Sequence, residues 1–171
     1  TKDADGYYLA YPIYSKPMIS EGTYDDVFVN KYIFKNSSTN RDNVLTVTLH
    51  NEIPAPLPSG AWDISDNNSQ SAYAWLTTSV KDSTKYDLHL AADGVMYASS
   101  AYGLFGGYAN CTDINGLQYL NTSYATNFSS MFRADTSLSQ LDLSSLDTSN
   151  ADYMYRMFYG DTKLTYLDIS N

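Results

Sequence analysis

The sequence predicts an α/β solenoid: a stack of similar coils with short parallel strands and short helices, preceded by a mostly β N-terminal region. Two observations favour this class, a repeat of 26 residues and a regular apolar spacing inside each repeat. Met131-Phe132 recurs as Met157-Phe158, and Leu141-Asp142 recurs as Leu167-Asp168. A fixed period of this length is typical of proteins in which each unit buries its apolar face against the next unit.

A fainter copy of the repeat lies upstream, at a distance of 27 positions. It consists of Phe105, Cys111 and Ile114, which precede Phe132, Leu138 and Leu141. We therefore expect two internal columns of stacked side chains: Phe105, Phe132 and Phe158 in one, and Ile114, Leu141 and Leu167 in the other.

Cys111 occupies a leucine position of the repeat, which favours a buried core thiol. The alternative, a reactive thiol, lacks a cationic neighbour that would lower its pKa.

Within one repeat, the spacing of Leu138, Leu141, Leu143 and Leu146 is that of a leucine-rich repeat. In a strand, Leu141 and Leu143 point to one face and Asp142 points to the other. Residues 125–132 and 151–158 carry apolar side chains at i, i+3 and i+4, which predicts about two turns of helix in each segment. The unit is therefore expected to be a short helix, a turn and a strand.

The rest of the chain contributes β structure. Residues 6–14 and 27–34 are expected strands, and residues 44–50 alternate, with Leu45, Val47 and Leu49 on the apolar side. His50 and His89 fall on the polar sides of their strands and are expected to be solvated. We divide the chain into a β-rich N-terminal region (1–52), a proline-rich connector (53–60), a cap of the stack (61–100) and repeat coils (101–171). Because the chain ends inside a repeat, we interpret it as a fragment of a longer protein.

A set of motifs in the C-terminal two thirds resembles a known family. The motifs are Ala61-Trp62-Asp63-Ile64-Ser65, Gly103-Leu104-Phe105, Ser130-Met131-Phe132, Leu141-Asp142-Leu143, Asp147-Thr148-Ser149-Asn150 and Met157-Phe158-Tyr159-Gly160. Residues 61–171 thereby resemble the BspA-like leucine-rich-repeat bacterial surface protein family. The resemblance implies a secreted or wall-anchored protein of host-associated bacteria that mediates adhesion.

Composition limits the classes of partner. The net charge of −9 argues against binding to nucleic acid or to an anionic membrane surface. No stretch of eighteen apolar residues exists, so no membrane insertion of these residues is expected. Seventeen tyrosines, with abundant serine, threonine and asparagine, favour an extracellular, cell-surface location. One cysteine excludes an intrachain disulfide framework.

The sequence offers little catalytic chemistry. The two histidines lie in no nucleophile or zinc-ligand pattern, and no phosphate-binding glycine loop occurs. Asp63, Asp66, Asn67 and Asn68 have oxygens that suit calcium, but a polar turn is the favoured interpretation. Asp142 and Asp168 would stack about 5 Å apart on neighbouring strands, and their place in the repeat explains them without catalysis. We expect no enzyme, no metal and no cofactor.

We therefore predict a non-catalytic adhesion or recognition module that binds a protein or glycan through its solenoid face. The candidate ligand-face residues are Gln140, Asp142, Tyr166 and Asp168. The alternative is a structural stalk or spacer within a larger surface protein. Because the last coil has no neighbour in the sequence, we also expect self-association through residues 157–171, or high mobility there.

Overall fold

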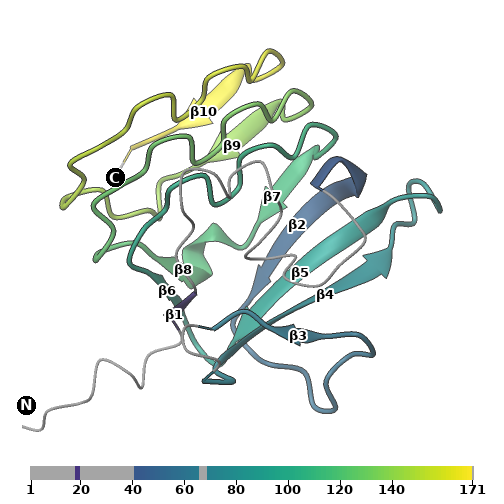
Figure 1. Cartoon of the computed structure of the whole chain (residues 1–171). Helices are drawn as coiled ribbons and strands as arrows, with labels where there is room; N and C mark the ends of the chain where they lie inside the picture. Colours follow the sequence, from purple (N-terminus) through teal and green to yellow (C-terminus); the bar gives the residue numbers. More distant parts are fainter. Residues whose placement is uncertain (1–17, 20–40, 66–68, 171) are drawn as a thin grey trace, which may run out of the picture.

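The computed structural model describes residues 18–19, 41–65 and 69–170 (Figure 1). The strands expected at 6–14 and 27–34 lie outside the described residues. The largest sheet of the described residues is mixed and has five strands, in the order β3-β4-β5-β2-β7. Its strands are β2 (Val44–His50), β3 (Trp62–Asp63), β4 (Ala72–Thr78), β5 (Tyr86–Ala92) and β7 (Asp113–Asn115).

The parallel pairs of this sheet join distant parts of the sequence. β2 pairs in parallel with β5 on one side and with β7 on the other, while β3, β4 and β5 pair antiparallel. The sheet thus takes strands from the expected N-terminal region, the expected cap and the first repeat. The domain boundaries given above remain predictions.

A β-bulge near the start of β2 changes which of its first residues point into the core. The register with β5 shifts between Val44 and Thr46, so Val44 is buried together with Val47 and Leu49. Leu45, expected on the apolar side, is only half-buried. An extra residue at a bulge moves the preceding side chains to the opposite face, which the alternating pattern alone does not reveal.

Two smaller sheets complete the fold of the described residues. One has the order β1-β6-β8, and the other pairs β9 with β10 in parallel. In Figure 1, β7, β9 and β10 follow one another as successive steps. The bounds are β1 (Met18–Ile19), β6 (Met96–Ala98), β8 (Leu120–Asn121), β9 (Gln140–Asp142) and β10 (Tyr166–Asp168), and the two 3₁₀ helices are η3 (Arg41–Asn43) and η5 (Leu117–Tyr119).

The predicted α/β solenoid is wrong. The described residues contain no α-helix, only two three-residue 3₁₀ helices, and the chain adopts a β-rich fold with mixed sheets. Residues 125–132 and 151–158, expected as helices, contain no helix, and the second half of each is turn. We call residues 101–107, 127–134 and 153–160 the first, second and third turn segments.

Hydrogen bonding between turn segments explains the missing helices. In a helix each N–H bonds to a carbonyl four residues back, but here alternate N–H groups reach the next segment. Ala101, Gly103, Phe105 and Gly107 donate to the carbonyls of Asn127, Ser129, Met131 and Arg133, at 2.7–3.0 Å. Phe128, Ser130, Phe132 and Ala134 donate to those of Tyr153, Tyr155, Met157 and Tyr159, also at 2.7–3.0 Å.

The apolar spacing that predicted helices has another origin. Phe128, Met131 and Phe132 are fully buried, but Ser130 and Ala134 between and after them have positive φ values of 59° and 67°. Left-handed residues interrupt a helix and allow successive turns, which still bring side chains three and four residues apart to the same side. A helix of two turns is in any case marginal without strong tertiary support.

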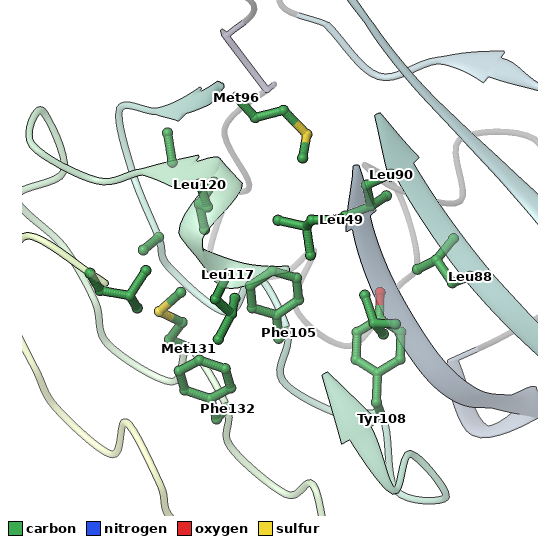
Figure 2. Close-up of a cluster of buried hydrophobic side chains, with 14 of the residues drawn as sticks. Leu49, Leu88, Leu90, Met96, Phe105, Tyr108, Leu117, Leu120, Met131 and Phe132 are labelled. Carbon is green, nitrogen blue, oxygen red and sulfur yellow. The ribbon is translucent and has the colours of Figure 1, made fainter. Parts of the chain in front are cut away.

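The core confirms the predicted aromatic column. Phe105 stacks on Phe132 with ring centroids 5.7 Å apart, and Phe132 stacks on Phe158 at 5.8 Å. Figure 2 shows Phe105 and Phe132 beside Met131 and Leu117, with Leu49 and Leu90 of the sheet close by. One continuous core therefore joins the five-stranded sheet to the turn segments.

The strand register of the repeat is also confirmed. Leu141 pairs with Leu167, and Asp142 pairs with Asp168. Ile114 pairs with Val47 of β2, so the first repeat continues the five-stranded sheet. None of the helices in the described ranges is both long and apolar enough to cross a membrane.

Cys111 is buried with no exposed surface, as predicted, and its Sγ lies 3.2 Å from the carbonyl oxygen of Asp113, to which the thiol donates. Burial raises the pKa of the thiol to about 12. The thiolate is the reactive form, so native protein at pH 8 should react with a thiol reagent about a thousandfold more slowly than denatured protein. Stopped-flow labelling measures both rates, and equal rates would place Cys111 at the surface.

Asp135 is a buried carboxyl between the second and third turn segments. Its Oδ1 accepts the N–H of Tyr108 at 2.8 Å, and its own N–H donates to Asp161 Oδ1 at 2.9 Å. Desolvation raises the pKa of Asp135 to about 9. Because this folded-state pKa lies above the unfolded value, stability should fall as pH rises from the unfolded pKa toward about 9.

The variant Asp135→Asn keeps the Oδ1 acceptor and removes the titration. At pH 9 its melting temperature should exceed that of the wild type by at least about 2 °C, and the difference should shrink as pH is lowered to 5. Calorimetry across this range tests the sign. A difference independent of pH would show that ionisation of Asp135 is not its cause.

Candidate functional site

The polar faces of β7, β9 and β10 form a shallow groove of about 280 Å³. The strands alternate, so the residues before and after each central apolar residue point away from the core. Gln140 and Asp142 flank the buried Leu141 and are both exposed. The groove is lined by Asp113, Ile114, Asn115, Gln140, Leu141, Asp142 and Tyr166.

Three of the four candidate ligand-face residues meet in this groove. Gln140, Asp142 and Tyr166 line it, and 57% of the Tyr166 surface is exposed. Asp168 is half-buried beside Asp142 and does not line the groove. Their role in binding remains a prediction.

Asp113 and Asn115 were not among the candidates, although the repeat could have identified them. They flank Ile114 as Gln140 and Asp142 flank Leu141. Asp113 forms a salt bridge of 3.0 Å with Lys81, which also bonds to Thr112 at 3.2 Å. Hydrogen bonds from the Thr112 hydroxyl and then Lys81 hold the pKa of Asp113 below its ordinary value, so the carboxylate is ionised at neutral pH.

The carboxylates of Asp142 and Asp168 each stabilise the turn that follows their strand. Asp142 Oδ1 accepts the N–H of Ser144, and Asp168 Oδ1 accepts that of Ser170, both at 2.9 Å. Bonds from Ser144 lower the pKa of Asp142. An acid–base pair needs one carboxyl that retains a proton, and a lowered pKa opposes this. The same turn in two successive repeats explains both residues.

The two histidines are not solvated as expected. His50 and His89 are half-buried, with His50 Nε2 3.1 Å from His89 Nδ1. Both rings stack on Trp75, at centroid distances of 5.5 and 5.1 Å. His89 Nε2 also lies 3.0 Å from the Thr77 hydroxyl. Neighbouring strands bring the rings together, and strand alternation alone does not predict such stacking.

The calcium alternative near β3 has no support from the described residues. Asp63 Oδ1 accepts the N–H of Ser65 at 2.8 Å, and its Oδ2 accepts that of Gln70 at 3.0 Å. These bonds occupy both oxygens of the Asp63 carboxylate. Asp66, Asn67 and Asn68 lie outside the described residues, so the polar turn remains a prediction. Within the described ranges, no group of three or more histidine, cysteine, aspartate or glutamate side chains is arranged to hold a metal.

The histidine pair should make stability depend on pH. Burial lowers the pKa of His50, and burial followed by the charge of His50 lowers that of His89. Lowered folded-state pKa values give stability that is present above the unfolded pKa near 6.5 and is lost as pH falls. Because Asp135 contributes in the opposite direction, the test is the difference between His89→Gln and the wild type: as pH falls from 7 to 5, the melting temperature of His89→Gln should rise relative to that of the wild type. A difference that does not change with pH would assign the effect to other groups.

The comparisons with known proteins cover only the repeat part of the chain. No curated protein and no solved structure matches the sequence. Residues 102–171 match the family described as "Mycoplasma protein of unknown function, DUF285", so this part of the chain, which includes β7, β9 and β10, is similar to that family.

Proposed function

We propose that the protein is a non-catalytic recognition module of a cell-surface adhesion protein, which binds its ligand in the groove across β7, β9 and β10. The observation that carries the proposal is the groove itself, in which three repeats place polar side chains at equivalent positions. The resemblance of residues 61–171 to BspA-like leucine-rich-repeat surface proteins supports an extracellular location and an adhesive role.

The groove chemistry favours a glycan over a protein ligand. Asn115 and Gln140 offer side-chain amides, Asp142 offers a carboxylate oxygen, and Tyr166 offers an aromatic ring with a hydroxyl. The two polar atoms of an amide or carboxylate can each form a hydrogen bond with one of two neighbouring sugar hydroxyls. An aromatic ring packs against the C–H face of a sugar. At about 280 Å³ the groove is small and open, which suits one or two sugar rings better than the large interface of a protein partner.

The charge of the groove further restricts the ligand. Asp113 and Asp142 both have lowered pKa values and remain ionised at neutral pH. The whole chain has a net charge of −9. Anionic sugars such as sialic acid would be repelled, so we propose neutral or amino sugars as ligands.

Replacing Tyr166 should remove the packing surface for the ligand without unfolding the protein, because its side chain is largely exposed. On a glycan array followed by calorimetry, Tyr166→Ala should bind about tenfold more weakly than the wild type, and Gln140→Ala should also bind more weakly. Tyr153→Ala is the matched control, since Tyr153 is 63% exposed and lies outside the groove.

Equal affinities of Tyr166→Ala and Tyr153→Ala would contradict a site in the groove. Absence of binding to any glycan or host matrix protein would favour the alternative, a stalk or spacer within a larger surface protein.

A further inference from the structure

The two histidines of the chain meet on the face of the five-stranded sheet that is turned away from the core. β5 lies between β4 and β2 (Figure 1). His89 of β5 pairs with Trp75 of β4, and His50 of β2 pairs with Ala91 of β5. Because the side chain of Ala91 is a single methyl group, the His50 ring can reach past it to His89 and Trp75.

The separation of the two facing ring nitrogens suits two ligands of one metal ion. His50 Nε2 lies 3.1 Å from His89 Nδ1. Two imidazole nitrogens, each bound to Zn²⁺ at about 2.0–2.1 Å, lie about 2.9 Å apart at a right angle and about 3.4 Å apart at the tetrahedral angle. The observed separation falls between these two values. A hydrogen bond between the rings has a similar length, and it is the contact that an ion replaces.

Thr77 selects the nitrogen of His89 that can bind an ion. His89 Nε2 lies 3.0 Å from the Thr77 hydroxyl. When Nε2–H donates to this hydroxyl, the lone pair of the neutral ring is on Nδ1, the nitrogen that faces His50. Histidines that bind metals commonly donate their other ring N–H to an oxygen, which fixes the tautomer and the orientation of the ring. Thr77 therefore prepares His89 as a ligand.

The surroundings hold both rings in place and attract a cation. Trp75 is only 7% exposed, and its ring centre lies 5.5 Å from that of His50 and 5.1 Å from that of His89. Asp87, on the same face of β5, accepts the Thr46 hydroxyl at 2.8 Å, and its negative charge acts on His89. Burial lowers the pKa of both histidines, so the rings are neutral at pH 7, which is the form that binds metals.

We propose that His50 Nε2 and His89 Nδ1 together bind a divalent transition-metal ion of the class that imidazole prefers, which includes Zn²⁺, Ni²⁺ and Cu²⁺. Water fills the remaining positions of the ion, because no third histidine, cysteine, aspartate or glutamate of the described residues is placed to join the pair. Both rings are half-buried, so the ion reaches them from the solvent side of the sheet. The hydrogen between the rings moves from His50 Nε2 to His50 Nδ1 through water, and both ligands stay neutral.

The ion joins two strands that are distant in the sequence. The two histidines are 39 residues apart, and β2 connects the sheet to β7 and the groove. A ligand that binds only the folded state stabilises it by mass action. The site therefore stabilises the sheet wherever the metal is present, and it does so independently of any ligand in the groove.

Titration calorimetry with ZnCl₂ on the chelator-treated whole chain tests the site directly. One Zn²⁺ should bind per chain, and Mg²⁺, which prefers oxygen ligands, should not compete with it. His50→Gln and His89→Gln should each weaken the binding of Zn²⁺ at least about tenfold, since each removes one of two protein ligands. Absence of binding to the wild type, or unchanged affinity in both variants, would overturn the proposal.

A threonine variant tests the orientation of His89 without removing a ligand. Thr77→Val loses the hydroxyl and keeps the branched shape, and it should weaken the binding of Zn²⁺ about tenfold. Thr78→Val is the matched control, because Thr78 is the next residue of β4 and is also exposed. It should bind Zn²⁺ as the wild type does. Equal affinities of the two variants would contradict the use of His89 Nδ1 as a ligand.

Tryptophan fluorescence locates the ion. Ni²⁺ quenches tryptophan emission at short range, and Trp75 stacks with both histidine rings. At equal Ni²⁺ concentration, the wild type should be quenched more strongly than His50→Gln. Asp142→Asn, which removes a carboxylate of the groove, should be quenched as strongly as the wild type. Quenching that is kept in His50→Gln and lost in Asp142→Asn would place the ion in the groove and overturn the proposal.

Thermal unfolding measures the effect on stability. With Zn²⁺ about a hundredfold above its dissociation constant, the melting temperature of the wild type should rise by at least about 4 °C. The rise should be absent in His89→Gln. Each protein is compared with and without Zn²⁺, so a change in the stability of the variant itself cancels. A rise of the same size in His89→Gln would assign the binding to other groups and overturn the proposal.

Discussion

Everything in the repeat part of this protein depends on hydrogen bonds between backbone groups one repeat apart. The turn segments are irregular, yet every second peptide of the second segment has its C=O toward the first segment and its N–H toward the third. These bonds satisfy buried polar groups that a helix would satisfy internally. They also fix the spacing at which Phe105, Phe132 and Phe158 stack. Hydrogen bonding between repeats and aromatic packing between repeats therefore favour the same arrangement.

The regular stacking also builds the candidate binding surface. Because β9 and β10 pair in register, equivalent residues of successive repeats line up on the polar face. β7 belongs to the five-stranded sheet through β2, so the groove lies where that sheet meets the later repeats. The larger sheet packs behind one end of the groove, and a preorganised groove is the arrangement that the proposed binding would require.

The repeat made part of the site predictable. The period of 26 residues places Gln140, Asp142 and Tyr166 on one surface, and the fainter copy 27 positions upstream places Asp113 and Asn115 beside them. It could not predict the stacking of the two histidines with a tryptophan. That contact joins three strands, and only the pairing of the sheet decides which of their residues become neighbours.

The sequence by itself determined the period, the register of Leu141 with Leu167, and the burial of Cys111, because each follows from apolar side chains that recur at fixed distances. The tertiary structure alone decided that residues 125–132 and 151–158 form turns and not helices. The same spacing of buried side chains suits both conformations. The difference lies in where the backbone N–H groups find acceptors, and those acceptors belong to the neighbouring repeat.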